Sequence, residues 1–409
     1  QNDFEKATDY YNKAIKLNDS NESAFYGRAM AYRSLFNYKK AIEDFNRAVD
    51  LNPNDNYAFS NRAVTYSNMG DVDKAIDDFN KALELEPQDI FALNGRGIAY
   101  RKRLDEESAE KDFKYALELM PEDSYAYYNL ANLYREQGND AKALKLYSQA
   151  IETNYLFVLP YIARAGMFLM QENVKKAAED IYQVIDIMPN GFAAYMIDGF
   201  IKFLQENYEG AFASFKKADE LSVTEMPEII YACGICFYKQ EKYKQAEEYF
   251  DKALGSGFDI PELLYTKGVC LLKENKYEQA INDFTLVLDK KKTFAEANYN
   301  RALAFIKIEK FNNAVEDLKK CIEQKYNLYE SNYYYGLCNL KLKIYDEALA
   351  NFQTAVKGGL KNKDILKNRA YVLSRLGLYE KAVGDYNEVL LSDSADLSVH
   401  IDKAKALIS

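Results

Sequence analysis

The sequence predicts an all-α solenoid in which antiparallel helix pairs stack on one another. The first observation is an alanine that recurs every 34 residues, from Ala41 to Ala211 and, after a shift of one residue, from Ala246 to Ala382. A repeat of this length is typical of helical hairpins that stack into an array, each contacting its neighbours. The second observation is a Gly or Ala twelve positions before each of these alanines. Small residues on successive helices let the two axes approach closely.

With that alanine as position 20, the chain divides into eleven complete repeats and a half repeat at each end. Residues 1–21 supply only the second helix of a pair, helix B, and residues 397–409 supply only a first helix, helix A, or a capping helix. Residues 22–226 hold repeats one to six, and residues 227–396 hold repeats seven to eleven. The expected total is about 24 helices. The complete repeats begin at Glu22, Asn56, Ile90, Ser124, Val158, Phe192, Pro227, Pro261, Ala295, Tyr329 and Lys363.

Core and linker positions justify both helices of each repeat. Position 24, in helix B, is bulky throughout, as in Phe45 and Tyr147, and is expected to fill the space between neighbouring repeats. Prolines fall between the helices or in the first turn of helix A, where a missing N–H costs little. They are Pro53, Pro87, Pro121 and Pro189 at position 32, and Pro160, Pro227 and Pro261 in the first three positions of helix A.

The chain changes character near Val223, where one residue is inserted between repeats six and seven. Before the insertion most linkers carry proline at position 32, and after it that proline never recurs. We interpret the insertion as a soft boundary between two subdomains of one solenoid. A local change in superhelical pitch is the alternative.

Two positions of the repeat vary together. In seven repeats a basic residue at position 7 accompanies an aspartate at position 23, as with Arg28 and Asp44, and the other four repeats have neither. We infer an ion pair between helices A and B of one hairpin. Its role is structural, and a partly exposed pair contributes about 0.3–1 kcal/mol.

These positions resemble the tetratricopeptide repeat over essentially the whole chain, with a small residue at 8, an aromatic at 11, alanine at 20, an aromatic at 24, a small residue at 27 and proline at 32. The resemblance implies a right-handed superhelix in which positions 2, 5, 9, 12 and 13 of helix A face a concave groove. Two binding schemes of the family do not fit. A carboxylate clamp needs lysine at position 5 and asparagine at 9, whereas Lys367 is followed by Tyr371, and an asparagine ladder at position 6 is interrupted.

The groove positions of repeats seven to ten share one pattern, with Glu at 2, Tyr at 5, an aliphatic residue at 9 and Lys at 13. We interpret this apolar strip, which repeats five and six extend, as a binding surface, because tyrosines combine contact area with a polar tip. Two alternatives stay open: the rings bury one another, and the charges complement helix dipoles at about 0.3–1 kcal/mol each. The candidate residues are Met196, Phe200, Phe203, Tyr231, Tyr238, Lys239, Tyr265, Leu272, Lys273, Tyr299, Leu303, Lys307, Tyr333, Leu337 and Lys341.

The expected partner is another protein, bound through an extended peptide or an amphipathic helix. The first half offers Arg33, Arg101 and Arg135 at position 12, and this more cationic groove suits an acidic segment. A net charge of -10 argues against nucleic acid, and no apolar run is long enough for membrane insertion. Weak self-association through the end repeats is a further expectation.

Residues for catalysis are sparse. His400 is the only histidine, which excludes most histidine-based triads and metal sites. Cys233 and Cys236 have redox spacing but lie within a predicted helix A, and the odd total of five cysteines suits reduced core residues in a cytoplasmic protein. We therefore expect a non-catalytic scaffold or adaptor without cofactor or metal. The alternative is the targeting or substrate-recruiting region of a larger enzyme, because Gln1 opens in mid-repeat and suggests a fragment; removal of a signal peptide stays open.

Overall fold

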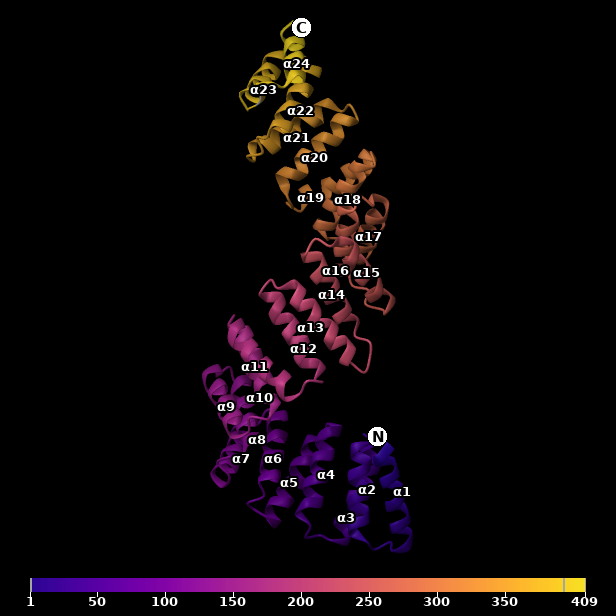
Figure 1. Ribbon diagram of the computed structural model, residues 1–409, viewed down its shortest axis with the longest axis vertical. Coiled ribbons are helices and arrows are strands. Elements are labelled where there is room, and N and C mark those ends of the chain that lie inside the picture. Colours follow the sequence, from indigo (N-terminus) through magenta and orange to yellow (C-terminus); the bar gives the residue numbers. More distant parts are fainter. Residues whose placement is uncertain (1, 393, 409) are drawn as a thin grey trace. The chain divides into compact units, whose positions relative to one another are not determined.

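The computed structural model describes residues 2–392 and 394–408, which form 24 α-helices and no β-strand (Figure 1). From α1 to α11 and from α13 to α24, each helix packs on the next one along the chain. This is the all-α solenoid of helix pairs that the sequence predicts. Contacts divide the chain into two compact parts, Gln1–Ile197 and Asp198–Ser409, which we call the N-terminal body and the C-terminal body. The boundary expected at residues 226/227 stays a prediction.

The repeat boundaries expected from the sequence coincide with helix starts. Helix A begins at the expected residue in every complete repeat except the tenth, where α20 begins one residue earlier, after Asn327 in a left-handed conformation (φ 40°). The A helices are α2 (Glu22–Ser34), α4 (Asn56–Met69), α6 (Ile90–Lys102), α8 (Ser124–Glu136), α10 (Val158–Met170), α12 (Phe192–Leu204), α14 (Pro227–Lys239), α16 (Pro261–Lys273), α18 (Ala295–Lys307), α20 (Leu328–Lys341), α22 (Lys363–Arg375) and α24 (Leu397–Ile408). The B helices are α1 (Asn2–Leu17), α3 (Tyr38–Leu51), α5 (Val72–Leu85), α7 (Glu106–Leu119), α9 (Asp140–Thr153), α11 (Val174–Ile187), α13 (Tyr208–Leu221), α15 (Tyr243–Gly255), α17 (Tyr277–Lys290), α19 (Phe311–Glu323), α21 (Tyr345–Lys357) and α23 (Tyr379–Ser392).

Short polar residues start many of these helices. Asp55, Asp89 and Asp123 cap α4, α6 and α8, because each carboxylate accepts a hydrogen bond from a free backbone N–H of the first turn. Asn139 caps α9 in the same way. Between helices A and B, position 15 has a positive φ in all eleven repeats, although only three of these residues are glycine.

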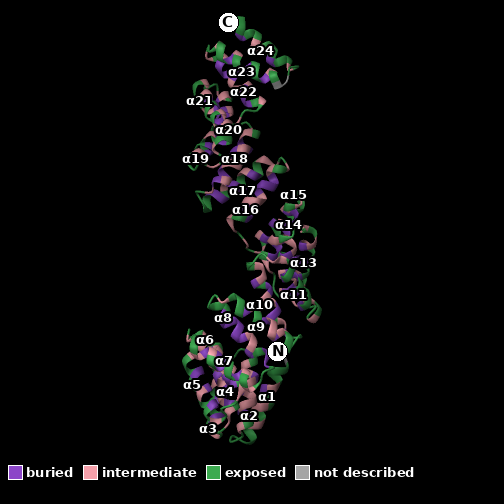
Figure 2. Ribbon diagram, turned by 90° about the vertical axis from the view of Figure 1, so that its left-hand side faces the viewer, coloured by how far each residue is buried: buried purple, intermediate pink, exposed green. Residues whose placement is uncertain are grey.

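The small residue at position 8 faces the bulky residue at position 24 of the same repeat. A Cβ atom added to Gly234 would lie 2.6 Å from Phe250, so the ring occupies the space that the glycine leaves. Burying one such ring contributes about 1.5–3 kcal/mol. Buried residues occur along the helices of both bodies (Figure 2). The residues at position 24 are all buried, as predicted: Phe45, Phe79, Phe113, Tyr147, Ile181, Phe215, Phe250, Phe284, Leu318, Phe352 and Tyr386.

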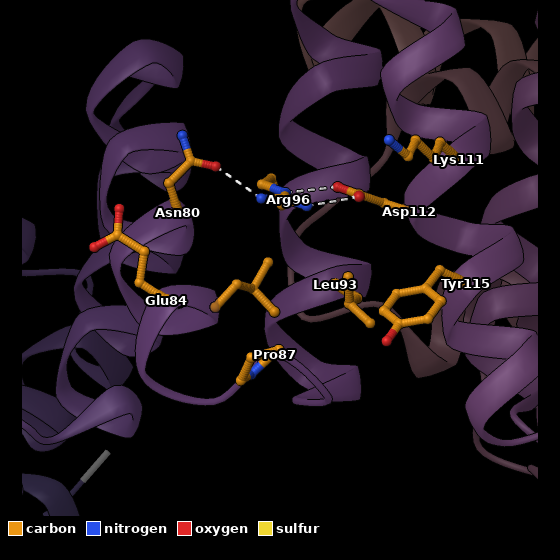
Figure 3. A pocket seen from close by; sticks show the side chains of 9 residues that line it. Asn80, Glu84, Pro87, Leu93, Arg96, Lys111, Asp112 and Tyr115 are labelled. Atoms are coloured by element: carbon orange, nitrogen blue, oxygen red, sulfur yellow. Dashed lines mark hydrogen bonds and ion pairs between the residues drawn. The ribbon is translucent and has the colours of Figure 1, made fainter.

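The predicted pair between positions 7 and 23 is confirmed, and it has a third partner. Nε and Nη2 of Arg96 donate to the carboxylate of Asp112 at 2.8 Å each (Figure 3). Nη1 donates to Oδ1 of Asn80, also at 2.8 Å. Because Asn80 belongs to the preceding repeat, the arginine ties two repeats together. The same three-way contact is made by Arg28, Arg62, Arg164 and Arg301.

Candidate protein-binding groove

The A-helix face of the C-terminal body is hollowed between α12 and α14. The cavity measures about 400 Å³, and we call it the C-terminal socket. Groove positions 2, 5, 9 and 12 of two successive A helices meet there, and Phe215 of α13, which is buried, forms the floor. The socket is lined by Phe200, Phe203, Phe215, Glu228, Tyr231, Ala232 and Ile235.

Aromatic packing fixes the walls of the C-terminal socket. Phe200 is 49% exposed and lies edge-on to Phe215, with ring centres 5.1 Å apart. Phe203 lies edge-on to Tyr208 at 5.2 Å. Glu228 is exposed, and its carboxylate makes no ion pair or hydrogen bond with any residue that the structure describes. The socket is therefore a preformed apolar hollow with one free negative charge in its lining.

The four tyrosines at position 5 are partly buried and pack mainly against rings of their own repeat, and one of these ring contacts, between Tyr299 and Tyr334, reaches the next repeat. Tyr265 contacts Phe284 and Phe294, with ring centres 6.0 and 5.1 Å away. Its hydroxyl accepts a hydrogen bond from Nδ2 of Asn300 at 3.0 Å, and burial raises its pKa to about 12. The others each contact two rings: Tyr231 with Phe250 and Phe258, Tyr299 with Tyr326 and Tyr334, and Tyr333 with Tyr334 and Phe352.

Packing within each repeat therefore accounts for much of the tyrosine surface. Among the four, Tyr231 also lines the C-terminal socket, together with Phe200 and Phe203. A binding role for any of the four tyrosines stays a prediction.

The remaining candidates lie outside the socket. Tyr238, Leu272 and Leu337 are partly buried against the core, Leu303 is partly buried, and Met196 belongs to the N-terminal body. The four lysines are exposed, and none makes an ion pair or a hydrogen bond within the described ranges. They are Lys239, Lys273, Lys307 and Lys341, which end α14, α16, α18 and α20.

The N-terminal body has a hollow of similar size between α8 and α10, which we call the N-terminal socket. It measures about 400 Å³ and also lies at groove positions. The repeat pattern did not predict a role for Gly166 at position 9, although an isolated glycine inside a helix often has a packing or functional reason. A Cβ atom at Gly166 would have no neighbouring heavy atom within 4 Å. The socket is lined by Tyr128, Arg135, Leu159, Ile162, Ala163, Gly166, Met167 and Met170.

A third hollow, of about 520 Å³, lies on the B-helix side of the N-terminal body (Figure 3). Arg96 crosses it, but its Nε, Nη1 and Nη2 already donate to Asp112 and Asn80. The hollow lies beside the row of ion pairs between positions 7 and 23, which we call the ion-pair ladder. Its main cation, Arg96, is already bound by Asp112 and Asn80. It favours no ligand.

The described residues offer little for catalytic chemistry. The five cysteines are buried, and burial raises the pKa of Cys233 and Cys236 to about 12, which suppresses the reactive thiolate at neutral pH. Within the described ranges, no cluster of His, Cys, Asp and Glu has the arrangement of a metal site. None of the helices described there is both long and apolar enough to cross a membrane.

Comparison with known proteins identifies the family to which this chain belongs. Profiles described as tetratricopeptide repeat match more than half of the chain, at residues 1–21, 23–55, 57–89, 124–154, 234–296, 295–327 and 345–397. No curated protein matches it. Similar solved structures include YrrB, described as a TPR protein with an unusual peptide-binding site, which is 25% identical with a TM-score of 0.40, over 43% of this chain and 91% of its own.

Two further solved structures also match. A tetratricopeptide repeat protein from Parabacteroides merdae ATCC 43184 is 23% identical with a TM-score of 0.47, over 58% of this chain and 93% of its own. A chain of the APC/C hetero-tetramer Cut9–Hcn1 is 12% identical with a TM-score of 0.44, over 100% of this chain and 94% of its own. Because the profiles match repeats in both bodies and cover more than half of the chain, this chain belongs to the tetratricopeptide-repeat family.

Proposed function

We propose that this protein-interaction scaffold binds a peptide segment or an amphipathic helix of a partner protein along the A-helix face of its C-terminal body, without catalysis. The observation that supports the proposal is the C-terminal socket, an open apolar hollow of about 400 Å³ with Phe200 half exposed in its wall. Recognition pockets in proteins are typically apolar with a few polar groups that set orientation. This hollow has that composition.

The socket takes a large apolar side chain of the partner as its anchor. Burying such a side chain contributes about 1.5–3 kcal/mol, and the aromatic walls are already ordered by packing, which lowers the entropy lost on binding. Glu228 accepts hydrogen bonds from a basic residue beside the anchor. The exposed lysines at the opposite ends of the A helices, of which Lys239 is the first, suit acidic residues on the other side of the bound segment.

The test uses peptides selected from a phage-displayed random library on the full chain. Each selected peptide is labelled and its affinity is measured by fluorescence polarisation against the wild type and two variants. Ala232→Phe fills the socket, and Ala213→Phe places the same ring on the exposed face of α13 as the matched control. We expect about 10- to 100-fold weaker binding for Ala232→Phe and unchanged binding for Ala213→Phe.

Circular dichroism melting must show that both variants keep the fold of the wild type. The proposal is wrong if the selected peptides bind Ala232→Phe as tightly as the wild type. It is equally wrong if the library yields no peptide above the level captured by an unrelated helical bait. A third variant, Glu228→Lys, tests the rim charge: peptides with a basic residue beside the apolar anchor are expected to lose affinity, and acidic ones to gain it.

A further inference from the structure

We propose that the N-terminal socket is a second recognition site, which takes a large apolar side chain from an acidic peptide segment. All of its lining residues belong to the N-terminal body. The inference is therefore independent of the function proposed for the C-terminal socket.

The socket exists because Gly166 has no side chain. Glycine is unfavourable in the interior of a helix, and it is usually retained where another group approaches closely. Here no atom approaches, since a Cβ would meet nothing within 4 Å. At the same position, repeat six has Phe200 and repeat seven has Ile235. Packing within the chain therefore does not require a glycine here, and the space that it leaves is open to a ligand side chain.

The spacing of the A helices provides the room. Successive A helices are in close contact from α2 through α4 and α6 to α8, and this contact loosens between α8 and α10. Met170 is 85% exposed and Leu159 is 45% exposed at the edge of the hollow. The flexible side chain of methionine adapts to varied apolar partners.

Arg135 sets the charge of the ligand. It is the one charged residue in the socket lining, it is exposed, and it makes no ion pair or hydrogen bond within the described parts of the chain. A guanidinium binds a carboxylate through two parallel hydrogen bonds, which fixes orientation as well as charge. The nearby Arg101 lies 3.8 Å from Glu136, so this carboxylate is associated with a different arginine. An aspartate or glutamate beside the apolar anchor is the complementary partner.

The experiment follows methionine methyl groups by NMR in the full chain. The chain has eight methionines, so ¹³C-methyl labelling gives a sparse spectrum in which Met→Leu variants assign Met167 and Met170. The probes are two synthetic peptides, Ser-Gly-Asp-Asp-Leu-Asp-Asp-Gly-Ser and the same sequence with lysine in place of aspartate. We expect the acidic peptide to shift both methyl signals saturably, with a dissociation constant about tenfold lower than that of the basic peptide.

Two substitutions separate the hollow from its charge. Gly166→Leu places a side chain in the socket, where its Cβ meets no heavy atom within 4 Å, and is expected to abolish the shifts while the melting temperature stays equal or rises. Arg135→Glu leaves the hollow and is expected to reverse the preference toward the basic peptide. Gly166→Ala, which keeps most of the space, serves as the matched control and is expected to retain binding.

Three results would overturn the inference. One is equal binding of the acidic and basic peptides, and another is unchanged binding to Gly166→Leu. The third is the absence of any shift at peptide concentrations of several millimolar, about the weakest affinity that counts as recognition. Ala232→Phe, in the C-terminal body, is expected to leave all of these results unchanged, so failure of one proposal is distinguishable from failure of the other.

Discussion

The two bodies are built on the same repeat but are stabilised differently. In the N-terminal body, four of the first five repeats carry an arginine at position 7 that binds Asp in its own helix B and a polar residue of the preceding repeat. In the C-terminal body only Arg301 and Arg369 keep the two-pronged pair. Lys267 replaces arginine in repeat eight, and Cys233 and Tyr335 replace it in repeats seven and ten. The comparison shows that the same fold accepts either an ion pair or apolar packing between positions 7 and 23.

Side-chain caps at the starts of the B helices are also more frequent in the N-terminal body. Asn37, Asn139 and Asn173 cap the B helices of the N-terminal body with their side chains. In repeats eight and nine the corresponding residues are Lys276 and Lys310, which provide no side-chain cap. Since stability in a repeat array is close to a sum over repeats and their interfaces, we expect the C-terminal body to be the less stable one.

Thiol labelling tests this comparison most directly, because all five cysteines are in the C-terminal body. The buried thiols react only when that body opens, so we expect labelling by a disulfide reagent at pH 8 to be slower than in the unfolded chain by about a thousandfold or more. In a urea series, labelling should become fast before helicity measured by circular dichroism is fully lost. Coincident transitions would show that the bodies do not differ in stability.

Removing one ion pair between positions 7 and 23 is expected to have the next largest effect, on the free energy of unfolding. Asp112→Leu leaves the Arg96 guanidinium without its carboxylate, and we expect a loss of roughly 2–4 kcal/mol in the free energy of unfolding. The double variant Arg96→Leu/Asp112→Leu reproduces the apolar pair Leu130 and Leu146 of repeat four and should recover most of that loss. Urea unfolding of the four members of the cycle gives the coupling energy. A double variant as unstable as the single one would mean that apolar packing cannot replace the ladder here.

The lysine in the ladder makes the stability of repeat eight depend on pH. Burial raises the pKa of Asp283 to about 6, and Nζ of Lys267 lies 3.7 Å away, too far for a hydrogen bond. Between about pH 4 and 6, Asp283 therefore carries a proton in the folded state that it has released in the unfolded state. Burial of the charged carboxylate destabilises the fold above pH 6, and this penalty is lost as the pH falls from 6 to 4.

Lys267→Arg supplies a guanidinium that can donate two hydrogen bonds to Asp283, as arginine does in the other repeats. We expect this substitution to stabilise the protein at pH 7.5 by roughly 1–3 kcal/mol. The gain should shrink at pH 4.5, where Asp283 is protonated in the wild-type fold. Urea unfolding at the two pH values measures both gains. An equal gain at both would show that the effect is not linked to the titration of Asp283.

Cap exchange gives the smallest effect. Lys310→Asn gives α19 a side-chain acceptor for its first turn, and we expect a gain of about 1 kcal/mol. Asn139→Ala removes the existing cap of α9 and should lose a similar amount. Melting temperatures of the two variants and the wild type check both signs. A neutral Lys310→Asn would mean that other contacts already satisfy the start of α19.

The sequence predicted the periodic features well, because they depend on contacts within one repeat. The start of helix A, the burial of Phe250 at position 24, and the pairing of Arg96 with Asp112 all follow from residues at fixed spacing. The site was harder to predict. Phe200, Phe203 and Tyr231 were named and do share a hollow, whereas Gly166 and Ala232 were not, since an absent side chain has meaning only when the distance to the next helix is known.

The sequence by itself determined the repeat, its helix boundaries, and which positions of each helix are buried. These features follow from a 34-residue period and from small or bulky residues at fixed positions, whose contacts lie within one repeat. Only the tertiary structure decided which cations reach the preceding repeat, which tyrosines are used in packing, and where two A helices move apart enough to leave a socket. These outcomes depend on the separation and rotation of neighbouring repeats. Both quantities arise from many weak contacts summed across an interface, and no single position of the repeat encodes them.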